Sequence, residues 1–180
     1  MSKARLLVGA STMLDGLPVA VANSSVLTKY ALPLQKAVLG LSGLVVDIAA
    51  ADDFGGLQIA TFPDTNMLIA GFMIDAVATL SGTLVATNLT VGLGSATAAA
   101  TPLATTAIDY MEAVAATGAA QTATIKGHSF DNTTPALVFK DAASTNKLFV
   151  NAAITTTPAA TLTFTSGGVT MFYYDLGEVS

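Results

Sequence analysis

The chain has 180 residues, of which 52% are hydrophobic and only 11% charged, and its formal net charge is −5. The absence of cysteine excludes disulfides, thiolate zinc sites and a cysteine nucleophile. Its seven lysines and arginines are scattered, which argues against direct binding of nucleic-acid phosphates.

The first 42 residues differ from the rest of the chain, because short apolar clusters alternate there with glycine, proline and serine. We interpret residues 1–42 as an N-terminal arm of short strands and residues 43–180 as one domain with a single core. An arm that becomes ordered on a neighbouring molecule would contribute contact area. The arm residues expected at an assembly interface are Arg5, Leu6, Leu7, Leu17 and Val19.

Neither export nor a membrane-spanning helix is predicted. The apolar part of the N-terminus is interrupted by Asp15, Gly16 and Pro18, unlike that of a signal peptide. The longest uncharged stretch, residues 76–108, contains polar residues and glycines and lacks about 20 consecutive apolar residues.

From Gly55 onward, apolar and polar residues alternate with a period of two, which is typical of half-buried strands. After a turn at 63–66, we predict a long strand over 67–80, near the middle of a sheet. A strand over 87–93 follows, with Leu89, Val91 and Leu93 inward. The apolar face expected for the long strand comprises Leu68, Ala70, Phe72, Ile74, Ala76, Ala78 and Leu80.

The middle of the chain gives weaker signals. Residues 96–106 are rich in alanine and threonine and contain Pro102, so we predict a loop. Residues 106–118 fit one short helix, with Thr106 and Asp109 as a capping box and Gly118 as its end, or else irregular structure.

The C-terminal part returns to short strands, separated by turn residues. We predict them over 122–125, 136–139, 148–154, 161–165 and 169–176, the last two forming a hairpin around 166–168 (SGG). The pattern predicts an all-β fold, a jelly-roll-like β-sandwich with at most one short helix.

Few residues are suited to catalysis. His128 is the single histidine, in an expected loop, and could form a triad with Ser129 or Ser144 and an aspartate. No nucleophile-elbow motif accompanies them, so a solvated or packing histidine is favoured and no enzymatic activity is expected.

The carboxylates allow two further interpretations. Asp52 and Asp53, with Asp47 or Asp64, could bind calcium, but a solvent-exposed loop tip is favoured, so we predict neither a metal nor a cofactor. Asp75, on an otherwise apolar strand, is expected either to pair with a lysine or arginine, across the sheet or between subunits, or to be simply exposed.

Aromatic residues are densest in the last predicted strand. Met171 and Tyr173 alternate there with Phe172 and Tyr174, so the two pairs cannot share a face. We therefore expect Asp75, Phe172 and Tyr174 to join the arm residues at an assembly interface, where tyrosine is enriched.

Residues 43–180 resemble small virion proteins of tailed bacteriophages, of the capsid decoration or cement type. The resemblance is carried by 55–63 (GGLQIATFP), 67–80, 88–97 (NLTVGLGSAT), 146–154 (NKLFVNAAI) and 168–177 (GVTMFYYDLG). It implies a β-sandwich, often a homotrimer, bound to the outside of the major capsid protein lattice without enzymatic activity. It also implies location on the capsid exterior, with assembly in the host cytoplasm.

Two other classes stay open. One is another virion protein, such as a head-fibre base, a minor capsid protein or a tail component. The other is a carbohydrate-binding β-sandwich, which is less favoured because the chain has no tryptophan and its tyrosines are mostly clustered in one strand.

Overall fold

The computed structural model describes residues 13–14, 17–18, 34–48, 53–62, 66–81, 86–129, 138–140, 147–155 and 160–177. The chain divides into two units, residues 1–35 and 36–180. In the first unit, β1 (Met13–Leu14) pairs antiparallel with β2 (Leu17–Pro18).

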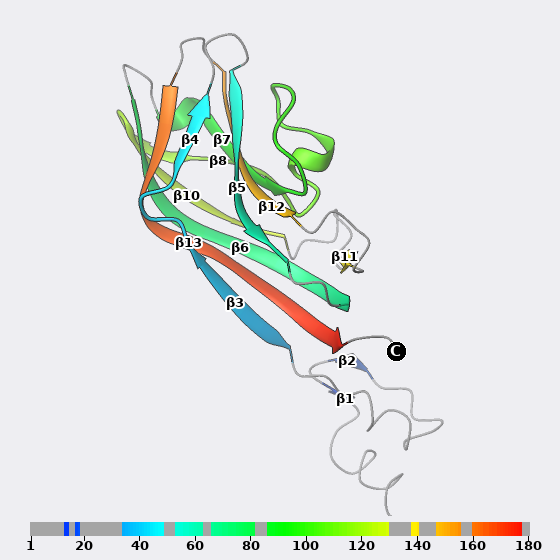
Figure 1. The fold of residues 1–180 in the computed structure, drawn as a ribbon. Helices are drawn as coiled ribbons and strands as arrows, with labels where there is room; N and C mark the ends of the chain where they lie inside the picture. The colour runs from blue at the N-terminus through cyan, green and yellow to red at the C-terminus, as the bar shows by residue number, and fades with distance from the viewer. Residues whose placement is uncertain are drawn as a thin grey trace, which may run out of the picture. The chain divides into compact units, whose positions relative to one another are not determined.

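The second unit is built from two antiparallel sheets, which confirms the predicted all-β sandwich (Figure 1). The larger sheet has the order β3-β13-β6-β10-β9, with β4 also paired to β13 and β11 to β6. The smaller sheet has the order β5-β12-β7-β8. The larger sheet consists of β3 (Gln35–Gly40), β4 (Val45–Ile48), β6 (Asn66–Leu80), β9 (Thr117–Ala119), β10 (Thr122–His128), β11 (Val138–Lys140) and β13 (Ala160–Gly177). The smaller sheet consists of β5 (Phe54–Thr61), β7 (Leu89–Gly94), β8 (Met111–Ala115) and β12 (Lys147–Ile154).

One continuous apolar core lies between the sheets. The predicted inward residues of the 87–93 segment, Leu89, Val91 and Leu93, are fully buried in it. Because successive side chains of a strand point to opposite faces, each strand gives alternate residues to the core and the others to an outer face. The two outer faces are therefore the places where the fold can present a functional surface.

The domain boundary follows from the pairing of β3. The sequence placed the boundary after residue 42, whereas the second unit begins at Lys36. β3 pairs with β13, and the chain continues through a turn at Ser42 and Gly43 into β4, which pairs with the same strand.

The long strand was predicted correctly in extent, but its inward face was wrong at one end. Residues Phe72 to Leu80 alternate as expected, whereas Met67 and Ile69 are buried in place of Leu68 and Ala70. The pairing with β13 shifts register there, with Phe172 opposite Gly71 and Tyr173 opposite Ile69. Ala70 is thus the extra residue of a β-bulge, which moves the preceding side chains to the other face.

The predicted C-terminal hairpin is wrong. Residues 160–177 form one strand, β13, which runs beside β6 along almost all of its length (Figure 1). Gly167 has φ +90, and a Cβ there would overlap the carbonyl of Asp75. The chain does not reverse at the glycines: Gly167 and Gly168 pair in register with Ala76 and Asp75, and the bulge of this strand lies at Thr165, between Phe164 and Ser166.

Of the two interpretations of residues 106–118, the single short helix is wrong, and the segment is not irregular throughout. Its start is a short 3-10 turn, η2 (Thr105–Ala107), and Met111 to Ala115 form β8 against β7. A second 3-10 turn, η1 (Ala86–Asn88), precedes β7. Within the described ranges no helix is long and apolar enough to cross a membrane.

Candidate functional site

The outer face of the smaller sheet carries a row of one asparagine between two glycines. Asn151 on β12 lies opposite Gly56 on β5 and Gly92 on β7. A Cβ at Gly92 would lie 2.6 Å from Cγ2 of Ile108, and one at Gly56 would lie 3.2 Å from Cα of Thr97. The two glycines therefore leave the space into which the segment after β7 packs.

Asn151 attaches that segment to the sheet. Its side chain is fully buried, and its amide nitrogen donates hydrogen bonds to the carbonyls of Ala96 and Ala107, each at 2.9 Å. Its Oδ1 accepts one from the backbone N–H of Ala98 at 2.8 Å. Three backbone groups of a loop are thereby satisfied by one side chain, as a buried asparagine requires.

Asp109 links the end of this segment to its beginning. Its two carboxylate oxygens accept hydrogen bonds from the backbone N–H of Ser95 at 2.7 Å and from the Ser95 hydroxyl at 2.6 Å. Asp109 thus joins the two ends of the loop instead of capping the predicted helix. Residues 95–109 cover the outer face of the smaller sheet with the protein's own chain.

The outer face of the larger sheet has no comparable cover in the part of the chain that the structure describes. Three of its large apolar side chains are exposed: Val38 on β3 (62%), Val45 on β4 (40%) and Met73 on β6 (43%). On each strand the neighbouring residues face the core. This surface, which we call the outer β6 face, is the candidate functional site.

Threonines occupy much of the outer β6 face. Thr122, Thr79 and Thr163 lie opposite one another on β10, β6 and β13. The hydroxyls of Thr79 and Thr165 donate hydrogen bonds to the carbonyls of Thr163 and Val77, at 3.4 and 3.1 Å. A hydroxyl that already donates to its own sheet needs no acceptor from a partner, so such a face can be desolvated at low cost.

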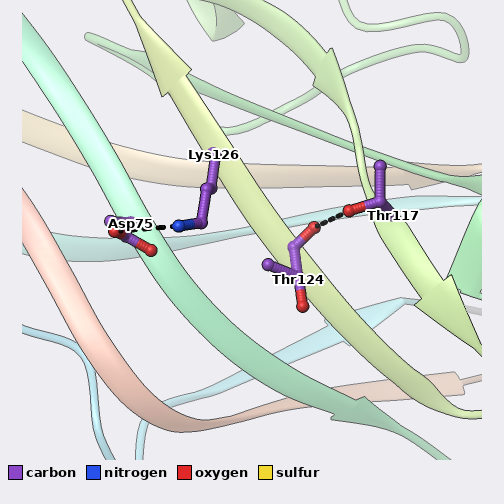
Figure 2. A network of polar contacts seen from close by, with 4 residues as sticks. All are labelled: Asp75, Thr117, Thr124 and Lys126. Carbon is purple, nitrogen blue, oxygen red and sulfur yellow. Dashed lines mark hydrogen bonds and ion pairs between the residues drawn. The ribbon is translucent and has the colours of Figure 1, made fainter.

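Charges of both signs lie on the outer β6 face. Among the side chains of this face that the structure describes, two lysines, Lys36 and Lys126, and two aspartates, Asp47 and Asp75, are exposed, so these four charges cancel. Figure 2 shows the Lys126 and Asp75 side chains pointing toward one another from neighbouring strands. Nζ of Lys126 lies 3.4 Å from Oδ2 of Asp75. Of the pairings considered for Asp75, the structure shows the one across the sheet.

The other predicted interface residues lie on the same face or outside the described residues. Phe172 and Tyr174 are partly buried on β13, on the face opposite Met171. Arg5, Leu6, Leu7 and Val19 are outside the described residues, as is the side chain of Leu17.

The residues considered for catalysis are placed differently from the prediction. His128 is an exposed residue of β10, opposite Met73, and not part of a loop. Ser129 extends the same pairing: its hydroxyl accepts a hydrogen bond from the Phe72 N–H at 2.7 Å, and its own N–H donates to the Phe72 carbonyl. Ser144 lies outside the described residues.

The carboxylates considered for calcium are only partly described. Asp53 is partly buried at φ 56, and its carbonyl accepts a hydrogen bond from the Ile154 N–H, so it is not an exposed loop tip. Asp52 and Asp64 lie outside the described residues. Among the residues that can be placed, no group of three histidine, cysteine, aspartate or glutamate side chains could hold a metal ion.

Tyr110 is the titratable group most affected by its surroundings among the residues that the structure describes. It is 3% exposed and packs against the rings of Phe62 and Phe72, with centroids 5.9 and 5.3 Å away. Burial, and secondarily the Asp109 carboxylate, raise the pKa of Tyr110 well above its usual range. Tyr110 is therefore a neutral core residue under ordinary conditions.

Sequence reasoning missed the features that distinguish the two outer faces. Asn151 was read only as part of a strand motif, although an asparagine within the apolar run LFVNAAI is a signal of a buried polar anchor. The exposure of Met73, at 43%, was not predicted either.

No protein-family model matches the chain, and no curated protein matches it.

Proposed function

We propose that this chain is a non-enzymatic virion structural protein, a decoration or cement protein that binds the outside of a tailed-phage capsid. Its partners in this proposal are the major capsid protein and further copies of itself, in a homotrimer as the sequence resemblance implies. It would be assembled in the host cytoplasm and located on the capsid exterior.

The observation that carries the proposal is the outer β6 face. It is broad, its described charged side chains balance one another, and it exposes Val38, Val45 and Met73. A protein that reinforces a shell by spanning neighbouring subunits needs contact area rather than a reactive cleft. Many copies on one lattice can each bind modestly and still hold collectively.

Low charge supports the same proposal. Only 11% of the residues are charged, so electrostatic repulsion contributes little to the solubility of the free protein. A protein bound to a particle buries part of its apolar surface in that contact. The segments that resemble decoration proteins include most of β5, β6, β7, β12 and the second half of β13.

The experiment is a measurement of protein stoichiometry in purified particles of the phage that encodes the chain. We expect hundreds of copies per particle, and loss of the chain on deletion of its gene should make heads less resistant to heat or to chelators. Copy numbers in small multiples of three or six would instead assign it to the tail or to a fibre base. Its absence from particles would refute a virion role.

A further inference from the structure

We propose that residues 95–109, which we call the strap, open and close as a unit while the rest of the sandwich stays folded. Asn151 on β12 is the latch that holds the closed state. In Figure 1 the strap is the green loop beside β12 that contains η2. The inference concerns the conformation of the free chain and does not rest on the proposed function.

The two ends of the strap are fixed to the body of the sandwich. Leu93, near the end of β7, is fully buried, and its carbonyl accepts a hydrogen bond from the Tyr110 N–H at 3.1 Å. The Tyr110 ring lies in the core against Phe62 and Phe72. Because both ends are held independently of the strap, it can open without removing β7 or β8 from the sheet.

The strap contributes little to the core between the sheets. Among residues 99–106, Leu103 is buried and the others are exposed. Leu103 and Ala107, at 5% and 3% exposure, are buried outside the core cluster formed by the described residues. Such small clusters under long loops are separate from the main core, so opening the strap leaves that core intact.

The polar contacts of the strap are concentrated on its two limbs. Asn151 bonds Ala96 and Ala98 on one limb and Ala107 on the other, and Asp109 bonds the first residue of the strap. Fixing the backbone of one residue costs about as much free energy as one hydrogen bond contributes. Asn151 and Asp109 bond only a few of the residues that the closed strap orders. The closed state is therefore favoured by a small margin, and that margin depends on Asn151.

Backbone strain in the strap opposes closure. Thr105 has φ 51, in the left-handed region that β-branched residues rarely adopt. Such a conformation raises the free energy of the closed state and persists only where the surrounding structure imposes it. Opening releases this strain, because Thr105 can then return to an ordinary backbone conformation.

Opening uncovers the row of the smaller sheet that lies under the strap. Asn151 stands in that row between Gly56 and Gly92, so its carboxamide is the only side chain there. A free carboxamide offers two donors and an acceptor to the backbone of another chain, as it now does to the strap. The strap therefore controls whether Asn151 is accessible.

The test is amide hydrogen exchange of the purified full-length chain, followed residue by residue by NMR at several low urea concentrations. The informative amides are those of Ser95 and Ala98, whose acceptors are Asp109 and Asn151. The amides of β6 report on the folded core. Local opening exposes little surface, so its rate depends weakly on urea, whereas global unfolding depends on urea steeply.

We expect the Ser95 and Ala98 amides to exchange at least about tenfold faster than those of β6, with a weak dependence on urea. Asn151→Ala should accelerate the exchange of both amides about a hundredfold, because the latch is lost. Gln58→Ala, on the neighbouring strand β5, is the control and should leave their exchange unchanged.

A second pair of variants tests the strain without removing the latch. Thr105→Asn should slow strap exchange at least about threefold, because asparagine tolerates the left-handed region. Thr106→Asn, the same change at a neighbouring exposed residue outside that region, is its control and should have no such effect. Equal exchange rates in the two variants would overturn the role assigned to Thr105.

Strap amides that exchange at the same rate and with the same urea dependence as those of β6 overturn the inference, because the strap then opens only with the whole fold. Strap amides that are unprotected in the wild type also overturn it, since no closed state would then exist. Exchange that Asn151→Ala leaves unchanged has the same consequence. The proposed function fails separately, because the presence of the chain on particles has no bearing on exchange in the free chain.

Discussion

Both outer faces of the sandwich belong to antiparallel sheets, but one is covered by a loop and the other is exposed to solvent in the described part of the chain. The smaller sheet places two glycines and Asn151 in one row and covers them with residues 95–109. The larger sheet places threonines and exposed apolar residues outward and leaves them uncovered in the part that is described. Substitutions on the first face should therefore affect folding, and substitutions on the second should affect association.

The largest effect is expected for Asn151→Ala. It leaves one buried carbonyl, one partly buried carbonyl and one partly buried N–H without their side-chain partner, which should lower the free energy of unfolding by about 3 kcal/mol. Urea denaturation measures this loss, and limited proteolysis should cut within residues 97–106. Gln58→Ala, which removes an exposed amide from the adjacent strand, is the control and should cost less than about 0.5 kcal/mol. Equal denaturation midpoints for the two variants would show that the loop is not anchored by Asn151.

Glycine-to-alanine substitutions at Gly94 on the smaller sheet and at Gly40 on the larger sheet compare the two outer faces directly. At Gly94 an added methyl group would overlap the Thr106 carbonyl, so Gly94→Ala should destabilise the protein by about 2 to 3 kcal/mol. At Gly40, on β3, no atom lies within 4 Å of such a methyl group, so Gly40→Ala should change stability by less than about 1 kcal/mol. Thermal melting of both variants tests the pair. A Gly40→Ala loss as large as that of Gly94→Ala would mean that the β3 side is covered after all.

Tyr110→Phe should show its effect in the alkaline range. Because burial raises the pKa of Tyr110 above its unfolded value, the neutral phenol is favoured in the folded state. The resulting stability is fully present below about pH 10, the ordinary tyrosine pKa, and is lost progressively as the pH rises further. Urea denaturation between pH 7 and pH 11 should give a shallower decline for Tyr110→Phe than for the wild type. Parallel declines would contradict the raised pKa.

The smallest effect on stability is expected for Lys126→Ala. Both side chains of the Lys126–Asp75 pair are about two-thirds exposed, at 68% and 70%, so the pair should contribute less than about 0.5 kcal/mol to folding. Chemical denaturation at low and high salt checks this value. A decrease in the free energy of unfolding above about 1 kcal/mol would show that the pair stabilises the folded sheet.

Local alternation was sufficient to predict most of the strands. The long strand of residues 67–80 and the strands near 89 and 148 follow directly from period-two patterning. Most of their side chains alternate between the core and the outer face. Alternation failed at Ala70, because a bulge depends on pairing with β13, about 100 residues later, and leaves no local mark. It failed at 166–168 because these residues continue the pairing with β6, opposite Val77, Ala76 and Asp75, although such glycines usually reverse a chain.

The candidate site was less predictable than the fold. Asp75 could be singled out as a charge on an apolar strand, but its partner is fixed only by the register of β10 against β6. The bonds of Asn151 join residues 44 to 55 positions apart, so no window of the sequence contains both partners. Whether a face is covered is a property of such distant contacts.

The position of β13 has a consequence for biosynthesis. Residues 160–177 supply the partner for one whole side of β6 and for both β3 and β4, all of which leave the ribosome much earlier. Until those last residues emerge, the nascent chain holds a fifteen-residue strand with one row of unpaired backbone groups. Such an edge is open to pairing with other nascent chains, so correct yield should depend on how quickly translation reaches residue 177 and on chaperones that hold the chain until then.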